Sequence, residues 1–199
     1  MTASQTMTRR RLLVGALGIA GLFAIGCGES CACNNPVPEA AEVTVYVVRH
    51  AEKQQLPGDA MGARDKDPPL SREGQLRAMS LTEDIPVNEL DAVYVTKTKR
   101  SEDTASAVVA LIGVDPIHYP PRDVEGLVQR LRKRHGQSVL VVGHSNTIPP
   151  LLKGLGVEDA VAIPEDQYGD LWVVKLAGGE ATLETRSFGE SAERFDPGR

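Results

Sequence analysis

The chain has 199 residues, with 22 lysines and arginines against 27 aspartates and glutamates, and a formal net charge of −5. This length suits one soluble domain with a single core. The acidic balance argues against nucleic acid as a partner, because affinity for a phosphate backbone depends on an excess of Lys and Arg. A phosphate ester could still bind, but only through positive charge gathered in a pocket.

The first 27 residues are typical of an export signal. Three arginines at 9–11 precede an apolar run over 12–26, which is shorter than the roughly 20 residues that span a bilayer. The paired arginines resemble a twin-arginine signal. Residues 24–27, Ala-Ile-Gly-Cys, resemble a bacterial lipobox and predict a lipid on Cys27, with an ordinary signal peptide or an uncleaved anchor as the alternative. We therefore expect export to the cell envelope and membrane contact through this lipid.

Residues 28–41 are predicted to be a flexible linker between this leader and a domain over 42–199, because prolines and polar residues interrupt any periodic pattern. The three cysteines, at 27, 31 and 33, all precede the domain. The domain therefore needs no disulfide framework. Cys31 and Cys33 are interpreted as incidental thiols of the tether, although outside the cytoplasm they could pair or bind a metal weakly.

The domain opens with a strand predicted over 43–49, which is β-branched and aromatic and lacks glycine and proline. It ends in Arg49-His50, a permanent cation beside a group that titrates near neutral pH. A second apolar strand, over 139–143, runs into His144 in the same way. Open α/β sheets bind ligands outside the carboxyl ends of their strands. We therefore expect both histidines to belong to a ligand site rather than to solvated turns.

Residues 54–69, rich in Gly, Asp and Pro, are predicted to form a loop over the end of the first strand and a wall of the pocket. Ser71 is the predicted N-cap of the next helix. A short strand over 91–95 then leads into a helix that begins with basic residues, Arg100 among them. Positive charge opposes the helix dipole at that end. An anion bound by the free N–H groups and by Arg100 would explain it.

Asp123 is predicted to cap the next helix, and its place after a strand also makes it a candidate pocket residue. The remaining elements are, in order, an edge strand over 116–119, a helix over 123–134, a helix opened by Ser145, a loop over 163–169 and a closing hairpin over 171–176 and 181–188. Strands that alternate with helices predict an α/β fold, a three-layer sandwich with a mostly parallel sheet covered by helices on both faces.

Four motifs in this order resemble the histidine phosphatase superfamily and its phosphoglycerate mutase-like fold. They are V-V-R-H-A-E-K at 47–53, L-S-R-E-G-Q-L-R-A at 70–78, V-Y-V-T-K-T-K-R-S-E-D-T-A at 93–105 and V-V-G-H-S-N-T at 141–147. The R-H-A-E form and the compact chain resemble the branch of small bacterial phosphohistidine phosphatases. The R-H-G-x-S motif and the large helical insertion of the mutases are both absent.

By position, the resemblance implies that His50 is the nucleophile that becomes phosphorylated. Arg49, Arg100 and His144 would complete the catalytic site and bind the phosphate of the substrate. Superfamily members that act on alkyl esters usually supply a carboxylic acid to protonate the leaving oxygen. Asp123 is the first candidate for this acid and Glu125 the second, whereas the phosphohistidine phosphatases manage without a strong acid because imidazole leaves more easily. Thr96 stands where the family commonly has serine.

The implied activity is hydrolysis of phosphomonoesters or phosphoramidates through a covalent phosphohistidine, with bidentate arginine donors on the phosphoryl oxygens. The sequence contains no H-x-x-x-H or C-x-x-C, and we expect neither a metal nor another cofactor. The expected pocket mouth, over 54–69 and 119–123, is poor in aromatics and arginines, which predicts broad use of small phosphorylated substrates, with a phosphoprotein also open. The alternative function is an exported lipoprotein on the same fold that binds phosphate or another ligand without turnover.

Overall fold

The computed structural model describes residues 41–55, 67–158 and 162–189. The predicted leader, most of the linker and all three cysteines lie outside these ranges, and so does most of the loop predicted over 54–69. No helix within the described ranges is both long enough and apolar enough to cross a membrane.

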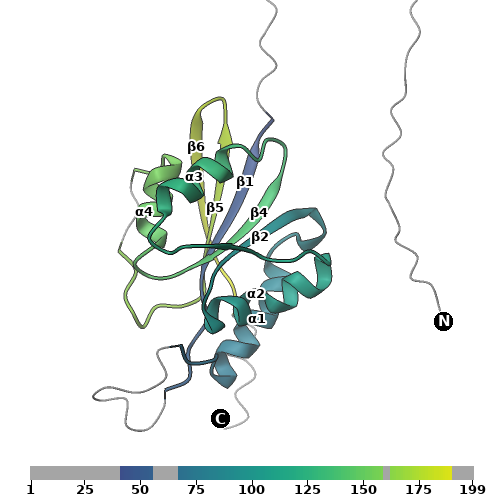
Figure 1. Cartoon of the computed structure of the whole chain (residues 1–199), viewed down its shortest axis with the longest axis vertical. Helices are drawn as coiled ribbons and strands as arrows, with labels where there is room; N and C mark the ends of the chain where they lie inside the picture. The colour runs from purple at the N-terminus through teal and green to yellow at the C-terminus, as the bar shows by residue number, and fades with distance from the viewer. Residues whose placement is uncertain (1–40, 56–66, 159–161, 190–199) are drawn as a thin grey trace, which may run out of the picture. The chain divides into compact units, whose positions relative to one another are not determined.

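A six-stranded sheet forms the centre of the domain, in the order β3-β2-β4-β1-β5-β6 (Figure 1). Its strands are β1 (Val43–Arg49), β2 (Leu90–Thr96), β3 (Ile117–Tyr119), β4 (Ser138–Gly143), β5 (Asp170–Ala177) and β6 (Glu180–Ser187). Strands β1 to β4 are parallel to one another, whereas β5 and β6 run antiparallel at one edge. The predicted mostly parallel α/β sheet is confirmed.

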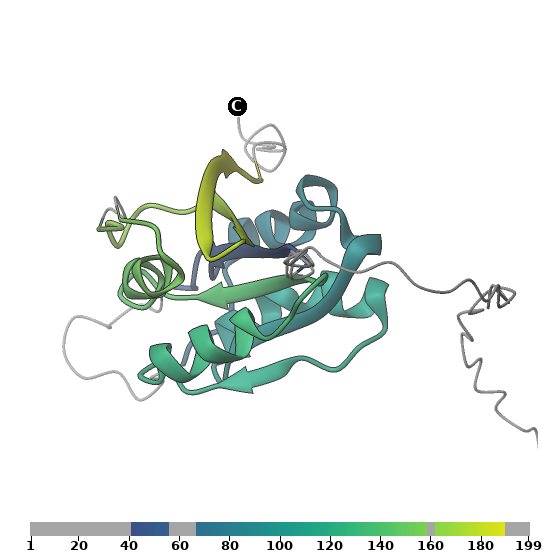
Figure 2. The same cartoon turned by 90° about the horizontal axis from the view of Figure 1, so that it is seen from above.

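Helices cover both faces of this sheet (Figures 1 and 2). They are α1 (Arg72–Asp84), α2 (Lys99–Ile112), α3 (Val124–Arg132) and α4 (Ile148–Leu155), with a short 3-10 turn η1 (Val87–Glu89) before β2. Successive strand residues point to opposite faces. Val47 accordingly packs in the core with α3 and α4, and Val48 packs in the core with α1 and α2. Burial on both faces explains why β1 and β4 are continuously apolar.

Helix α4 begins three residues later than predicted. Thr147 is the N-cap and Ile148 is the first helical residue. Pro149 lies in the first turn, where its missing N–H costs no hydrogen bond. Ser145 instead belongs to the turn between β4 and this helix. The hairpin was predicted correctly, and its two glycines, Gly178 and Gly179, have φ of 58° and 88°, which a tight turn of this kind requires.

Helix α1 is docked on the segment that follows β1. Ser71 caps the helix by accepting from the Gly74 N–H at 3.1 Å, as predicted, and its own backbone N–H donates to the Glu52 carbonyl at 2.9 Å. A side chain at Gly74 would collide with that same carbonyl. Gly74 therefore allows α1 to pack directly on the first motif. This packing fixes the chain just beyond His50.

Candidate active site

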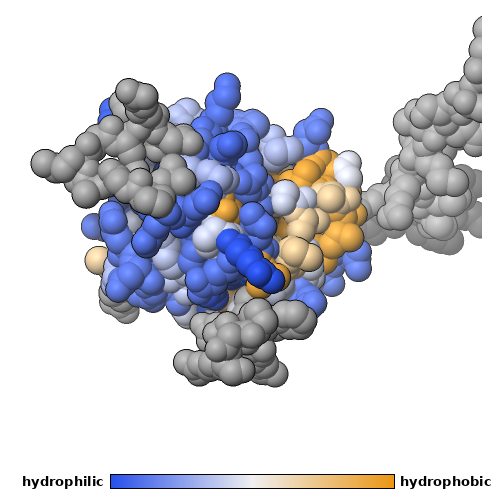
Figure 3. All heavy atoms as spheres, turned by 90° about the horizontal axis from the view of Figure 1, so that it is seen from below, coloured by the Kyte–Doolittle hydropathy of each residue, from blue (hydrophilic) through white to orange (hydrophobic). Residues whose placement is uncertain are grey.

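The carboxyl ends of β1 and β4 meet at one edge of the sheet. Arg49 pairs with Gly143 in the parallel register, so the next residues, His50 and His144, lie side by side with ring centroids 5.1 Å apart. Both are buried, with 5% and 8% of their surface exposed. This end of β1 points downward in Figure 1, and Figure 3, seen from below, shows that hydrophilic residues cover most of the face around it.

His50 is held so that one ring nitrogen is left for chemistry. Its Nδ1 lies 2.9 Å from the Ala51 carbonyl oxygen. A carbonyl only accepts, so Nδ1 carries the proton and Nε2 keeps a free lone pair. Its backbone N–H donates to Gly143, and the next N–H, of Ala51, donates to the Thr104 hydroxyl at 3.0 Å. The nucleophile predicted from the sequence is thus anchored by β4 and α2.

Burial makes both histidines weak bases. The pKa of His50 is lowered to about 3, chiefly by burial; the Ala51 hydrogen bond opposes this shift, and the neighbouring His144 and arginines add to it. The pKa of His144 is lowered to about 4, again chiefly by burial, then by Arg100 and Arg49, against an opposing effect of Asp67. Both imidazoles are therefore neutral at physiological pH, which is the form in which a histidine attacks an electrophile.

Thr96, at the end of β2, orients the second histidine. Its hydroxyl oxygen lies 2.8 Å from His144 Nε2 and the same distance from the Ser101 hydroxyl in the first turn of α2. Thr96 and Ser101 are both fully buried. Thr96, which stands where the resemblance leads one to expect serine, therefore contacts His144 through its hydroxyl group.

Arg49 holds a distant segment of the chain. Its Nη1 donates to the carbonyls of Pro164 and Gln167 at 2.8 and 2.7 Å, and its Nη2 donates to the carbonyl of Glu165 at 2.7 Å. Its guanidinium also stacks on the Tyr168 ring, 4.1 Å from the centroid. The buried Nε has no protein partner among the described residues. The bidentate contact with phosphate predicted for Arg49 thus differs from the structure, because both terminal nitrogens already bind carbonyls of the chain and Nε is the nitrogen without a partner.

Arg100, in the first turn of α2, already has an anionic partner. Its Nη1 lies 3.1 Å from one carboxylate oxygen of Asp67, and the other oxygen accepts from the Lys99 backbone N–H at 2.7 Å. The anion predicted at this basic helix start is thus supplied by the chain itself. Asp67 was missed because the sequence marks 54–69 only as a polar loop, without singling out one carboxylate.

A family model matches the part of the chain that carries most of these residues. The model of the histidine phosphatase superfamily (branch 1) matches residues 45–122, the range that contains Arg49, His50, Asp67 and Arg100. Over these residues the chain is similar to the histidine phosphatase superfamily, as its sequence motifs implied. This supports a phosphatase-type enzyme, as the resemblance implied. A comparison with curated proteins gives no match.

Solved structures that share the fold of this chain include the following three. YhfR of Bacillus stearothermophilus is 19% identical, with a TM-score of 0.57 over 72% of this chain and 96% of that one. The protein histidine phosphatase SixA, complexed with tungstate, is 21% identical, with 0.53 over 72% and 96%. Phosphoglycerate mutase of Bacillus anthracis is 15% identical, with 0.56 over 78% and 97%. At these identities the likeness establishes the shared fold.

The two carboxylates predicted as the general acid, Asp123 and Glu125, lie at the N-terminal end of α3. Asp123 accepts from the Gly126 N–H at 3.0 Å, so it is the predicted helix cap, and it also lies 3.6 Å from Arg130. Half of its side chain is exposed, and Glu125 is exposed as well. None of the contacts found within the described ranges joins either carboxylate to His50 or His144. The structure thus accounts for Asp123 as a cap, and its role as an acid stays a prediction.

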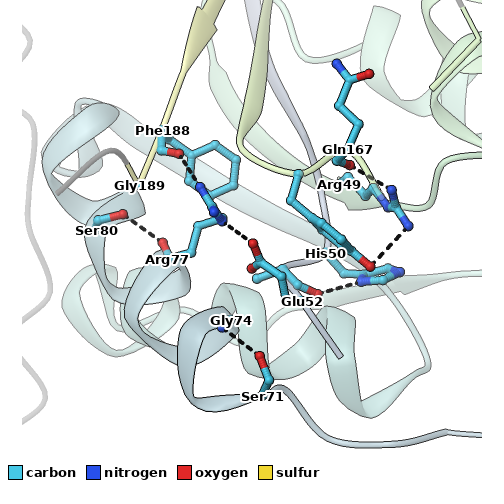
Figure 4. Close-up of polar contacts among 12 residues, drawn as sticks. Arg49, His50, Glu52, Ser71, Gly74, Arg77, Ser80, Gln167, Phe188 and Gly189 are labelled. Carbon is cyan, nitrogen blue, oxygen red and sulfur yellow. Dashed lines mark hydrogen bonds and ion pairs between the residues drawn. The ribbon is translucent and has the colours of Figure 1, made fainter. Parts of the chain in front are cut away.

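A buried ion pair between Arg77 and Glu52 lies next to the site (Figure 4). The Arg77 Nε of α1 donates to Glu52 Oε1 at 2.7 Å, and its Nη1 donates to the Phe188 carbonyl, just past β6, at 3.2 Å. Glu52 belongs to the R-H-A-E motif and lies two residues after His50. Both partners stand in motifs that the sequence singled out, but neither was predicted as a supporting residue, because the motifs themselves do not show that they touch.

Proposed function

We propose that this domain is a phosphatase that passes a phosphoryl group from its substrate to His50 Nε2 and then to water. The observation that carries the proposal is the state of His50: a buried, neutral imidazole whose Nδ1–H is bound by the Ala51 carbonyl. That arrangement leaves one lone pair, on Nε2, for in-line attack on phosphorus. The substrates we propose are phosphomonoesters or phosphoramidates, either small molecules or phosphorylated proteins.

The reaction has two steps. In the first, Nε2 bonds to phosphorus as the bond from phosphorus to the leaving oxygen or nitrogen breaks, and the leaving group takes up a proton. In the second, water attacks phosphorus, the N–P bond breaks, and phosphate departs with His50 neutral again. We assign Arg100, the Nε of Arg49 and the Lys99 N–H to stabilise the charge on the phosphoryl oxygens, because Arg49 Nε has no partner among the described residues and the other two donors already bind the Asp67 carboxylate. The proposed mechanism uses no metal.

Asp67 bears on this mechanism because it binds two of the donors that we assign to the phosphoryl group. The substrate phosphate must either displace the Asp67 carboxylate from Arg100 and Lys99 or share Arg100 with it. Arginine has five N–H donors in a planar fork, so sharing is stereochemically possible.

The decisive experiment is to assay phosphate release by the purified protein across a panel of phosphomonoesters and phosphoramidates, and to isolate the phosphorylated protein after rapid quenching. The proposal expects turnover of several substrates and an acid-labile phosphate on His50. Binding of phosphate without turnover or labelling would favour the non-catalytic ligand-binding protein instead. Labelling with a phosphoryl donor but no turnover across the panel would direct the search to a phosphorylated protein as substrate.

Removing the second cation of the site should slow catalysis strongly. Arg100→Ala is expected to lower kcat/KM, with a loss of transition-state stabilisation of about 2 to 4 kcal/mol. This is the scale found when one preorganised donor is lost. The measurement is the steady-state hydrolysis of p-nitrophenyl phosphate. Arg72→Ala, which removes an exposed arginine at the start of α1, controls for net charge. A change below threefold in Arg100→Ala would place Arg100 outside the phosphate site.

The buried histidines should make the fold sensitive to acid. The pKa values of His50 and His144 are lowered to about 3 and 4 in the folded state, against about 6.5 when unfolded. As the pH falls from about 6.5 towards 4, these two histidines therefore bind protons mainly in the unfolded chain. The free energy of unfolding should therefore fall by up to about 1.4 kcal/mol per pH unit for each histidine. Urea unfolding at pH 7.5 and 5 measures this loss.

The measurement compares the wild type with the double variant His50→Gln/His144→Gln. The control is His135→Gln, which removes an exposed histidine. The double variant should lose less stability between the two pH values than the wild type, because carboxylates elsewhere titrate equally in both proteins. The His135→Gln variant should behave as the wild type does. Equal losses in all three proteins would show that burial of His50 and His144 does not control the acid limb.

We also propose that the protein is exported and anchored in the cell envelope by a lipid on Cys27. The proposal rests on the basic cluster, the short apolar run and the lipobox-like residues 24–27. If it is right, Cys27→Ser releases the full-length protein from the membrane fraction, whereas the wild type and Cys31→Ser sediment with it. A Cys27→Ser protein that stays in the membrane fraction would instead indicate an uncleaved anchor.

A further inference from the structure

The segment 164–168 reaches the nucleophile, although the sequence marks it only as part of a loop. The centroid of the Tyr168 ring lies 6.2 Å from that of His50, with 56° between the ring planes. Tyr168 is half-buried and lies just before β5. Among the described residues, the ring contacts found for His50 are with His144 and Tyr168, and neither belongs to the predicted mouth over 54–69 and 119–123. The structure therefore places an aromatic side chain beside His50 from a segment outside the expected mouth, which is poor in aromatics.

The position of Tyr168 is fixed by protein contacts. Arg49 binds three carbonyls of the segment 164–168 and covers one face of the Tyr168 ring, with 4.1 Å to its centroid. The phenol oxygen lies 3.4 Å from Arg49 Nη2, which is long for a hydrogen bond, so the ring itself makes the principal contact. The residue after Tyr168 is held as well, because the Gly169 carbonyl accepts from the Phe188 N–H at 2.7 Å. An aromatic ring held in this way loses little freedom when a ligand packs on it.

We propose that Tyr168 determines the substrate class by favouring phosphoryl groups carried on flat, unsaturated rings. This inference rests on the proposed function. In-line displacement places the leaving group beyond phosphorus from His50 Nε2, and Tyr168 is the aromatic side chain that stands at this distance from the nucleophile. Flat rings pack on aromatic side chains in stacked or edge-to-face geometry and gain free energy beyond the area they bury. Alkyl and acyl leaving groups lack that gain.

The test compares ring and non-ring substrates whose leaving groups need little help from an acid. Phosphoimidazole and p-nitrophenyl phosphate carry flat rings, and acetyl phosphate carries none. The measured quantity is the ratio of kcat/KM for each ring substrate to kcat/KM for acetyl phosphate, determined with the full-length protein and with Tyr168→Ala. A ratio within one protein cancels any change in the amount of active enzyme.

Tyr168→Ala should lower this ratio roughly three- to tenfold for both ring substrates, through a higher KM, because an aromatic pair contributes free energy on that scale. Tyr168→Phe should keep the wild-type ratio within about twofold, since the ring and not the hydroxyl carries the effect. The matched control is Glu165→Ala, which alters an exposed side chain of the same segment and should also keep the wild-type ratio.

Two results would overturn the inference. Equal losses on ring and non-ring substrates in Tyr168→Ala would show that the residue only supports the segment 164–168. A lower ratio in Glu165→Ala to the same degree would show that any disturbance of that segment has this effect. Failure of the proposed function appears differently, because the wild-type protein would then hydrolyse none of the three substrates.

Discussion

The His50→Ala variant is expected to lose phosphatase activity by about a thousandfold or more while keeping its fold. Without the imidazole no N–P bond can form, and the reaction loses its covalent path rather than one stabilising contact. The other groups of the site stay in place, because Arg49, Arg100 and His144 are held by partners other than the His50 side chain. The measurement is release of p-nitrophenolate from p-nitrophenyl phosphate, with circular dichroism to verify folding.

The control for this variant is His135→Ala, since His135 is exposed in the turn before β4 and should leave turnover at the wild-type level. Rapid-quench labelling adds a second readout, because the phosphorylated species seen with the wild type should disappear only in His50→Ala. If a folded His50→Ala protein turns over within tenfold of the wild type, another residue is the nucleophile and the two-step reaction does not pass through His50.

The elements that carry His50, the proposed nucleophile, could be predicted because local pattern and topology agree there. Strands β1 and β4 are continuously apolar and end in histidines, and parallel neighbours in a sheet end at the same edge. From these two facts the sequence places His50 and His144 at one site, and the register of Arg49 with Gly143 brings their rings to 5.1 Å. No contact between distant loops had to be known for that part of the prediction.

The partners of the two arginines could not be predicted, because they depend on loop conformation. Arg49 bonds to carbonyls of Pro164, Glu165 and Gln167, more than 110 residues away. Backbone carbonyls exist at every position, so no residue type marks the ones that will be contacted. Asp67 is hidden in the same way, since it is one of several acids in a polar loop. Periodicity identifies strands and helices, but it does not encode which loop residue meets which side chain.

Arg49 shows how this matters for function. The sequence predicts that Arg49 binds the phosphate directly, whereas in the structure its terminal nitrogens bind carbonyls of the segment 164–168 and Nε is without a partner among the described residues. Arg49 thus connects β1, the strand before His50, to the segment that carries Tyr168. A substitution at Arg49 would alter phosphate binding and the position of Tyr168 together, which is why single substitutions at Arg100 and Tyr168 give cleaner tests of each part.

The largest effect on stability is expected from Arg77→Ala. Arg77 is 6% exposed, and its ion pair with Glu52 is almost entirely removed from water. Removing one member of a buried pair leaves the other as an uncompensated buried charge, which costs about 3 to 5 kcal/mol. The second oxygen of Glu52, Oε2, is also buried without a hydrogen-bond partner among the described residues. Arg77→Ala should therefore lower the free energy of unfolding by about this amount in urea titrations.

The double variant Glu52→Gln/Arg77→Met separates the charge from the packing. It removes both charges while keeping side chains of similar length, so it should recover much of the stability lost in Arg77→Ala. Any remaining deficit would measure the hydrogen bond from Arg77 to the Phe188 carbonyl and the packing of the arginine stem. A loss below about 1 kcal/mol in Arg77→Ala would contradict the argument and show that Glu52 finds water or another donor. Glu52 follows His50 by two residues, so the ion pair could also position His50. Measuring kcat of the double variant at urea concentrations below its unfolding midpoint would show whether it does.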